Sequence, residues 1–400
     1  MNRMLSPMLQ RTLTDWLGLE GLPERDPVRY QMLCQSVAEL SRLFTKDRAE
    51  RQRSYLDEAS LRAGYLAYFL PVNLAKVQAL LDELPALEPG ERPLVILDVG
   101  SGPGTAALGM LDWLQQQPGA RPRAVDAVVL DQSAHALREA EQFWMVYTRA
   151  AGITGATLTP LRADVAKGRW LDELRTRRPD GFDLILAANV LSEVGDGTKD
   201  AIERRTALSE GLLGLLAPQG SLIIMEPALR ETSRSLHQVR DALLAKQACT
   251  VYSPCLHEHP CPALVKEGDW CHEERPWTPP AIVSEIDQVV GFIKDALKFS
   301  YVILRKDGRT IVPRQPGLFR VVSELREMKG EKRAWLCNET GRPEVGRQDR
   351  LRSNENAAVD DWHRGAIVRI SEIVRKTKDG QQSTLGRIGK EASVEIVRPI

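Results

Sequence analysis

The stretch Leu97-Asp98-Val99-Gly100-Ser101-Gly102-Pro103-Gly104-Thr105 carries the clearest structural signal in this chain of 400 residues. It ends the continuous apolar run 94–99, which predicts a buried strand, and it precedes a helical pattern over 106–117. Glycines at such a turn let the backbone bend sharply and approach a ligand closely. The spacing is G-x-G-x-G, whereas the dinucleotide fingerprint has G-x-G-x-x-G, and no Lys-Ser/Thr pair follows to make a P-loop.

Alternating strand and helix patterns continue downstream of this turn. They predict a doubly wound α/β domain with a mainly parallel sheet. Further strands are expected at Ala127–Leu130, Leu158–Arg162, Leu184–Ala188, Ser221–Met225 and Tyr301–Leu304, and helices at Ala134–Ala150, Arg230–Lys246 and Ile282–Leu297.

The first 85 residues have helical periodicity, over Arg29–Phe44 and over Ala59–Leu84, where Pro71 is expected to break the helix. Three aromatic residues in the second segment are expected to pack against the core and not to bind a ligand. They are Tyr65, Tyr68 and Phe69.

After Pro313 the sequence changes to short β-type runs separated by turn signals such as Lys329-Gly330 and Asp379-Gly380. These runs predict a small β-barrel-like domain, for which an OB-like barrel is one option. The runs are Leu318–Val322, Arg333–Cys337, Ile367–Val374 and Val394–Val397. The expected domains are a helical region at 1–88, the α/β domain at 89–312 with a cysteine-rich insertion at 249–278, and a basic β-rich domain at 313–400.

Composition and charge narrow the class of protein. No apolar run is long enough to span a bilayer, and the amino-terminal residues lack the features of a signal peptide or presequence, so a cytoplasmic protein is expected. The net charge is zero, but residues 301–400 hold 21 Lys+Arg against 14 Asp+Glu. A basic terminal domain on an acidic body favours a polyanionic partner, and the alternative is an ordinary surface of mixed charge.

Four cysteines suggest a metal site. Cys255, Cys261 and Cys271 lie among prolines and histidines, and Cys337 lies in the β-rich segment. In a reducing compartment such a group favours metal binding over disulfides. The gaps are longer than the C-x2-4-C knuckles of structural zinc sites and suit an iron–sulfur cluster, although nearby histidines keep zinc open. Free buried cysteines are the remaining alternative.

The glycine-rich turn at 97–105 resembles motif I, D-x-G-x-G-x-G, of class I S-adenosylmethionine-dependent methyltransferases. That resemblance implies that Asp131 binds the ribose hydroxyls, that Asp164 meets the adenine amino group, and that Asn189 lies near the methyl donor. The residues expected to bind S-adenosylmethionine are Asp98, Gly100, Gly102, Gly104, Asp131, Asp164 and Asn189. No catalytic residue is assigned: Glu193 and Glu226 are candidate bases, but each is equally explained as a helix-capping or surface acid.

Taken together, the motifs resemble the methyltransferase-like proteins of the mitochondrial small ribosomal subunit and their bacterial relatives. The resemblance rests on 97–105, 186–193, 220–227 with Arg230, the block Cys-Leu-His-Glu-His-Pro-Cys-Pro at 255–262, 269–271 and 336–337. It implies a Rossmann-like methyltransferase fold, association with small-subunit rRNA, and a [4Fe-4S] cluster on Cys255, Cys261, Cys271 and Cys337. A bacterial, monomeric member is expected, and methyl transfer itself stays open.

The leading hypothesis is an rRNA-binding, methyltransferase-like factor whose cluster pins the β-rich domain onto the α/β domain. Arginines of the basic β-rich domain would contact RNA phosphates. They are Arg347, Arg350, Arg352, Arg364 and Arg369. One alternative is a catalytically silent RNA-binding assembly factor. The other is a small-molecule methyltransferase with a structural zinc site.

Overall fold

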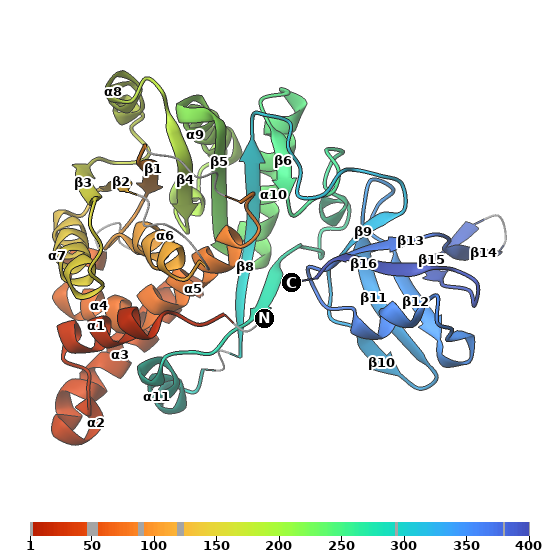
Figure 1. Cartoon of the computed structure of the whole chain (residues 1–400), viewed down its shortest axis with the longest axis horizontal. Coiled ribbons are helices and arrows are strands. Elements are labelled where there is room, and N and C mark those ends of the chain that lie inside the picture. The colour runs from red at the N-terminus through yellow and green to blue at the C-terminus, as the bar shows by residue number, and fades with distance from the viewer. Residues whose placement is uncertain are drawn as a thin grey trace.

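Two sheets organise the chain, a central one between layers of helices and a second one at the carboxyl-terminal end (Figure 1). The computed structural model describes residues 3–45, 55–86, 92–117, 124–292, 295–378 and 381–399. The expected boundary at 88/89 and the turn at 379–380 lie outside the described residues.

The central sheet has the strand order β3-β2-β1-β4-β5-β8-β6, and β7 pairs with β8. Strands β1 to β5 pair in parallel, whereas β8 runs antiparallel to β5, β6 and β7. The strands are β1 Leu94–Val99, β2 Val125–Asp131, β3 Ala156–Arg162, β4 Phe182–Ala188, β5 Leu216–Pro227, β6 Thr250–Ser253, β7 Glu273–Pro276 and β8 Ala296–Arg305. This order, with its reversal beside β1, confirms the predicted Rossmann-like methyltransferase fold.

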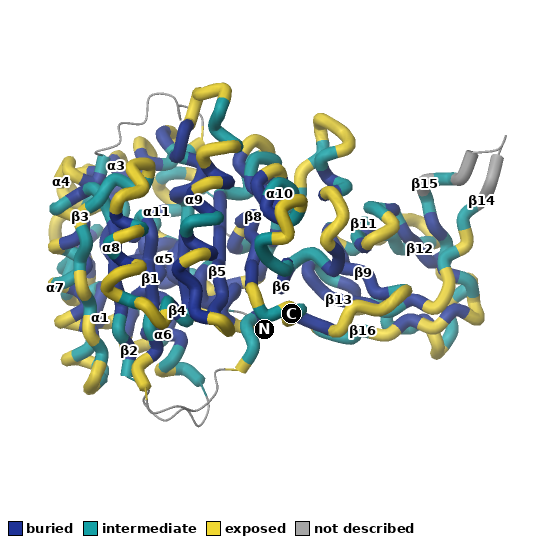
Figure 2. The backbone as a smooth tube through the Cα atoms, turned by 90° about the horizontal axis from the view of Figure 1, so that it is seen from above, coloured by how far each residue is buried: buried dark blue, intermediate teal, exposed yellow. Residues whose placement is uncertain are grey.

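Helices cover both faces of this sheet, which explains why its strands read as continuous apolar runs. One face packs on α6 (Thr105–Gln115), α7 (Ala134–Ala150) and the amino-terminal helices. The other packs on α8 (Arg169–Arg177), α9 (Ala201–Leu215) and α10 (Arg230–Ala245). In Figure 2 the central strands of the sheet, such as β1, β4 and β5, are buried between these layers, whereas the edge strand β3 is partly exposed.

The amino-terminal region is helical, as predicted, but Pro71 does not break it. Helix α4 passes through a π-helical turn, η3, directly into α5, and Pro71 is the second residue of α5, just after that turn. The elements are α1 Pro7–Leu17, α2 Leu22–Arg25, α3 Pro27–Thr45, η2 Tyr55–Asp57, α4 Ala59–Gly64, η3 Tyr65–Phe69 and α5 Leu70–Leu81. Among the described residues, no helix is both long and apolar enough to cross a bilayer.

The helix predicted at 282–297 is shorter than expected. Helix α11 spans Ala281–Val290 and ends at Gly291, whose φ of 73° is the left-handed conformation that terminates helices. Leu297 instead belongs to β8, whose ten residues pair with β5 over their carboxyl-terminal part. A glycine stop signal inside an apolar pattern therefore outweighed the helical periodicity.

The second sheet has the strand order β14-β15-β12-β11-β9-β13-β16, with β10 paired to β11. This sheet confirms the predicted second sheet domain. Among the described residues, its two edge strands are β14 and β16. The strands are β9 Leu318–Val321, β10 Arg326–Met328, β11 Glu331–Cys337, β12 Glu344–Gln348, β13 Ile367–Ile370, β14 Val374–Lys378, β15 Gln381–Arg387 and β16 Val394–Arg398. Short helical turns η6 (Asp349–Leu351) and η7 (Ala357–Asp361) connect β12 to β13.

A buried group of charged residues joins the two sheets. Glu83, just after α5, accepts hydrogen bonds from Arg275 on β7 (2.6 Å), Arg320 on β9 (2.9 Å) and Tyr301 on β8. Arg320 also approaches Glu273 at 3.3 Å, and all five side chains are buried. We call these five residues the buried charge cluster. It connects the amino-terminal helices, the central sheet and the second sheet at one point.

Candidate functional site

A cavity of about 380 Å³ opens at the carboxyl ends of β1, β2 and β4, where open α/β sheets bind their ligands. The glycine-rich turn, the ends of three strands and the amino-terminal helices all contribute to its wall. Five of the predicted cofactor residues line it: Gly100, Gly102, Asp131, Asp164 and Asn189.

Gly100 is required at the turn for two reasons. Its φ is 64°, and a Cβ there would lie 2.3 Å from a methyl group of Val190. The turn is therefore pressed against the loop after β4, and its backbone forms the floor of the cavity. Gly104 has a different role from the one predicted, since it lies outside the set of described residues that line the cavity; a Cβ there would press on Ala140 of α7 at 3.1 Å.

Asp98 also lies beneath the turn and not in the cavity wall. Its carboxylate accepts hydrogen bonds from the backbone N–H groups of Ala106 (3.0 Å) and Ala107 (2.9 Å), at the start of α6. An acid at a helix amino terminus satisfies N–H groups that have no partner in the helix. Burial raises the pKa of Asp98 to about 7 despite these two bonds. The acid of the motif thus holds the turn in shape.

Asp131 and Asn189 face the cavity from the ends of β2 and β4, on either side of β1. Asp131 accepts hydrogen bonds from the N–H groups of Gly102 (2.9 Å) and Ser133 (2.8 Å), and burial raises its pKa. Asn189 has a φ of 59°, which is uncommon outside glycine, and its N–H donates to Met225 at 2.7 Å. Strained backbone of this kind is concentrated at functional sites.

The amino-terminal helices supply an aromatic wall to the same cavity. Its members are Phe44, Tyr55, Tyr65 and Phe69. Tyr65 and Phe69 lie in the π-helical turn with stacked rings 6.1 Å apart. Tyr65 and Phe69 pack against the hydrophobic core as predicted and also line the cavity, whereas Tyr68 is fully buried and bonds to Asp287. The helical periodicity of the sequence does not show the π-helical turn that carries Tyr65 and Phe69.

Polar contacts hold this aromatic wall against the Rossmann-like domain. Asp57 accepts a hydrogen bond from Ser133 (2.5 Å) at the start of α7 and lies 3.2 Å from the Nδ1 atom of His135. The Tyr65 hydroxyl lies 3.4 Å from Thr105 Oγ1, at the start of α6. The cavity is thus built jointly by the amino-terminal region and the sheet.

The two candidate bases have different surroundings. Glu193 lines the cavity, whereas Glu226 is buried and accepts hydrogen bonds from the N–H groups of Leu191 (2.8 Å) and Ser192 (3.3 Å) in the turn η4 (Leu191–Glu193). Glu226 therefore positions the loop that carries Asn189, which is the structural role considered for it.

The four cysteines come from three segments of the chain. Cys255 and Cys261 lie in the loop after β6, Cys271 comes just before β7, and Cys337 ends β11 of the second sheet. Their thiols are close enough to perturb one another: burial and then the neighbouring thiols raise the pKa of Cys337 well above its ordinary value. Burial raises the pKa of Cys271 to about 11, although the charge of Arg342 acts in the opposite direction. Four such thiols can ionise together only if positive charge is placed among them.

Buried cations and hydrogen bonds surround these thiols. Arg240, which is fully buried, donates to the carbonyl oxygens of His257 (2.6 Å) and His259 (2.8 Å) and forms an ion pair with Asp241. These donors and the four thiols suit an anionic metal–thiolate group. No three His, Cys, Asp or Glu side chains of the described residues converge as one metal ion requires.

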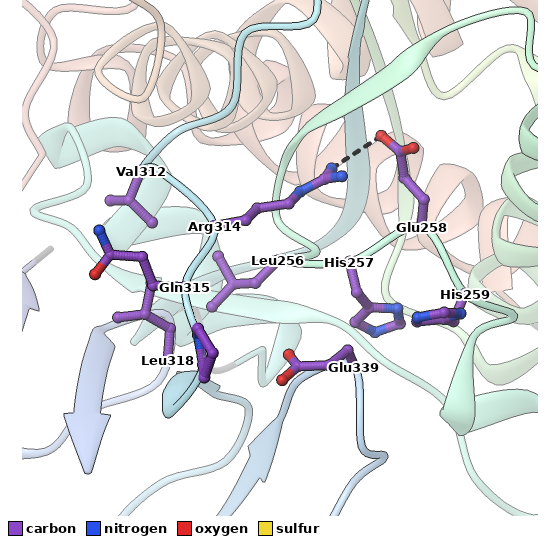
Figure 3. Close-up of a pocket in the computed structure, with 10 residues that line it drawn as sticks. Leu256, His257, Glu258, His259, Val312, Arg314, Gln315, Leu318 and Glu339 are labelled. Atoms are coloured by element: carbon purple, nitrogen blue, oxygen red, sulfur yellow. Dashed lines mark hydrogen bonds and ion pairs between the residues drawn. The ribbon is translucent and has the colours of Figure 1, made fainter. Parts of the chain in front are cut away.

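A second cavity, of about 470 Å³, lies beside the cysteine loop at the junction of the two sheets (Figure 3). Leu256, Val312 and Leu318 form its apolar side, and Glu258 pairs with Arg314 at 2.9 Å across it. His257 lies in its wall, and the Nε2 atom of His257 is 3.9 Å from the Sγ atom of Cys337. One side chain thus separates this cavity from the thiols.

The predicted phosphate-binding arginines are only partly available. Arg347 is buried and donates to Asn356 (2.8 Å) and Asp360 (2.5 Å), while Arg364 donates to the carbonyl oxygen of Val322 at 2.9 Å. The prediction is therefore corrected for these two, which brace the second sheet. The other three are more exposed and lie beside partners of their own: Arg350 beside Gln348, Arg352 beside Asp360 and Arg369 beside Glu395.

The fold and the cavity define a methyltransferase-like protein with a Rossmann-like sheet. Residues 59–347 match the family model described as mitochondrial small ribosomal subunit Rsm22. This match covers more than half of the chain, so the chain belongs to that family. A search of curated protein sequences gave no significant match.

Solved structures with a similar chain trace include several methyltransferases. Magnesium protoporphyrin IX methyltransferase from Synechocystis with bound SAH is 10% identical, with 68% of this chain and 100% of that chain covered and a TM-score of 0.34. An O-methyltransferase family protein from Burkholderia thailandensis is 14% identical, with 70% of each chain covered and a TM-score of 0.34. NSun6 from Pyrococcus horikoshii with SFG is 14% identical, with 59% and 51% covered and a TM-score of 0.34. These identities and TM-scores are low, so the fold assignment rests on the strand order of the central sheet.

Proposed function

We propose that this chain binds S-adenosylmethionine and small-subunit rRNA, as a methyltransferase-like factor in assembly of the small ribosomal subunit or in translation. The observation that carries the proposal is a formed cavity at the glycine-rich turn in a member of a small-ribosomal-subunit family. Whether a methyl group is transferred is a separate matter, because no described side chain is assigned as a base.

The residues of the cavity fit the parts of S-adenosylmethionine. Gly100 and Gly102 leave room for the methionine moiety close to the backbone, and Asp131 would accept hydrogen bonds from the ribose hydroxyls. Asp164, whose carboxylate already accepts from the N–H of Ala166 at 3.0 Å, would meet the adenine amino group. Asn189 would lie near the methyl donor, because it ends β4 at the opposite side of the turn.

Replacing Asp131 by alanine is expected to weaken binding of S-adenosylhomocysteine by tenfold or more, measured by isothermal titration calorimetry. The reason is the loss of charge-assisted hydrogen bonds, each worth about 1.5–3 kcal/mol. Asp126→Ala is the matched control, since Asp126 lies on the same strand but pairs with Arg178 at 2.6 Å, away from the cavity. Equal affinities for the two variants would contradict the assigned role.

We further propose that Cys255, Cys261, Cys271 and Cys337 hold a [4Fe-4S] cluster, with zinc as the alternative. The mutual proximity of the four thiols and the adjacent buried Arg240 support a metal–thiolate group. With all four thiols as ligands, such a cluster would act structurally and link the cysteine loop to the second sheet. Brown colour and about four irons per chain after anaerobic purification are the expected results, whereas zinc would establish the alternative.

The experiment that tests the function combines crosslinking with a methylation assay. The full chain is crosslinked in cells and the bound RNA is sequenced, and radiolabelled methyl transfer is then measured on immature small subunits. Enrichment of small-subunit rRNA supports the proposal, and its absence contradicts it in favour of a small-molecule methyltransferase. Crosslinks with cofactor binding but without methyl incorporation would define a catalytically silent assembly factor.

The compartment and oligomeric state belong to the same proposal: a monomer in the bacterial cytoplasm. All six cysteines are free, which fits a reducing compartment. Size-exclusion chromatography with light scattering tests the monomeric state.

A further inference from the structure

The cysteine-rich loop presents an exposed aromatic residue on a rigid support. Trp270 is 36% exposed, and among the large exposed hydrophobic side chains of the described residues it is the one aromatic. Its ring is stacked on His272, with centroids 6.1 Å apart and an interplanar angle of 21°. An exposed tryptophan held in one orientation has a low entropic cost of binding a flat partner.

Arg234 of α10 fixes the conformation of this loop. Its guanidinium donates to four loop carbonyl oxygens, at distances of 2.7 to 3.3 Å. These are the carbonyl oxygens of Ala263, Leu264, Lys266 and Asp269. These acceptors are neutral, and no carboxylate of the described residues forms an ion pair with Arg234, so Arg234 brings a positive charge to the loop.

The second sheet contributes the other half of the surface. Arg342 lies over the ring of Trp335 on β11, with the guanidinium carbon 5.9 Å from the ring centroid. Its NH1 atom lies 3.7 Å from the carboxylate of Asp269, the neighbour of Trp270. Trp335 precedes Cys337 by two residues on the same strand, so both side chains point to the same face of the sheet.

We propose that Trp270, His272, Trp335 and Arg342, together with the cations Arg234 and Lys266, form a stacking surface for unpaired bases of RNA. This inference rests on the proposed function and names the part of the RNA that the protein contacts. Aromatic rings and guanidinium planes bind bases by stacking, and nearby cations bind the phosphates. Duplex RNA, whose bases are already stacked, binds this surface poorly.

The surface is composite, because one tryptophan comes from the cysteine loop and the other from the second sheet. Arg342 contacts both parts, through Asp269 and through Trp335. The cysteines that flank it, Cys271 and Cys337, lie in the same two segments. The surface therefore exists only when the loop and the second sheet are held together.

The test uses the full chain and fluorescence anisotropy with a labelled, unstructured oligouridine and an RNA duplex of equal length. Trp270→Ala is expected to weaken oligouridine binding about tenfold, and Trp270→Phe is expected to restore most of the affinity. Val289→Ala, which removes an exposed apolar side chain on α11, is the control and is expected to bind like wild type. Ultraviolet crosslinking followed by mass spectrometry is expected to place the RNA on the peptide that contains Trp270.

Two results would overturn the inference and leave the proposed function intact. One is wild-type affinity of Trp270→Ala for oligouridine, with crosslinks elsewhere on the chain. The other is unchanged RNA binding combined with lost association of Trp270→Ala with ribosomal particles, which would make the surface a protein-binding one. Failure of the wild-type chain to bind any RNA would instead contradict the proposed function itself. Thermal unfolding of each variant establishes that the fold is retained.

Discussion

Replacing Arg320 by alanine is expected to lower the free energy of unfolding by about 3–5 kcal/mol, because it breaks a buried ion pair by removing one partner. Arg320 donates to Glu83 and to the Tyr301 hydroxyl, both at 2.9 Å, and lies 3.3 Å from Glu273. Without it, two buried carboxylates share the single guanidinium of Arg275. Urea unfolding at neutral pH, followed by tryptophan fluorescence, measures the change.

Arg326→Ala is the matched control on the same sheet. Arg326 is half exposed and pairs with Glu344, and exposed pairs contribute about 0–1 kcal/mol. Similar losses in the two variants would contradict the central role of the buried charge cluster.

The same cluster predicts how stability depends on pH. Burial alone raises the pKa of Glu83, but the attraction of Arg320 and Arg275, with hydrogen bonds from Ser253 and Tyr301, outweighs burial and lowers this pKa to about 2. A carboxyl whose pKa is lowered on folding stabilises the folded state above its unfolded pKa, near 4.5, and loses that contribution as the pH falls towards 2. This carboxyl contributes about 3 kcal/mol to the free energy of unfolding at neutral pH. The Arg320→Ala variant is expected to lose much of this dependence of stability on acid pH.

Replacing Cys337 by serine is expected to remove most of the iron from anaerobically purified protein and to speed proteolysis near residue 315. Cys337 is the one cysteine of the four on the second sheet, so its loss would remove the proposed metal link between that sheet and the cysteine loop. Iron is measured by a colorimetric assay against protein concentration, and cleavage is followed by limited trypsin digestion.

Cys249→Ser is the control for this prediction, since Cys249 precedes the cysteine loop but is not one of the four. It is expected to keep about four irons per chain and the wild-type resistance to trypsin. Unchanged iron and unchanged proteolysis in Cys337→Ser would contradict the proposed ligand set.

Much of the central sheet was predictable because its signals are local. The apolar run 94–99 and the glycines after it specify a buried strand and a tight turn, and the structure has β1 at Leu94–Val99. Asp131, Asp164 and Asn189 were predictable as neighbours because the carboxyl ends of parallel strands meet at one edge of the sheet.

The rest of the fold and of the candidate site depends on contacts between distant segments, which one sequence does not reveal. The roles of Asp98 and Gly104 differ from the prediction because packing of the turn against α6 and α7 determines which atoms face the cavity. Charge counts could not show that Arg347 and Arg364 are internal, because both the buried and the exposed arginines add to the same total. Tyr65 lines the cavity at the glycine-rich turn and lies in a π-helical turn that the periodicity of the sequence does not show.

The buried charge cluster also has a consequence for synthesis of the protein. Glu83 and Arg320 are 237 residues apart in the chain, yet each needs the other as a partner. At a translation rate of about 5–20 residues per second, Glu83 waits on the order of ten to fifty seconds after its own incorporation before Arg320 is made. During that time the growing chain holds the carboxylate without its main counter-charge. A nascent chain that terminates early therefore keeps an unfinished core.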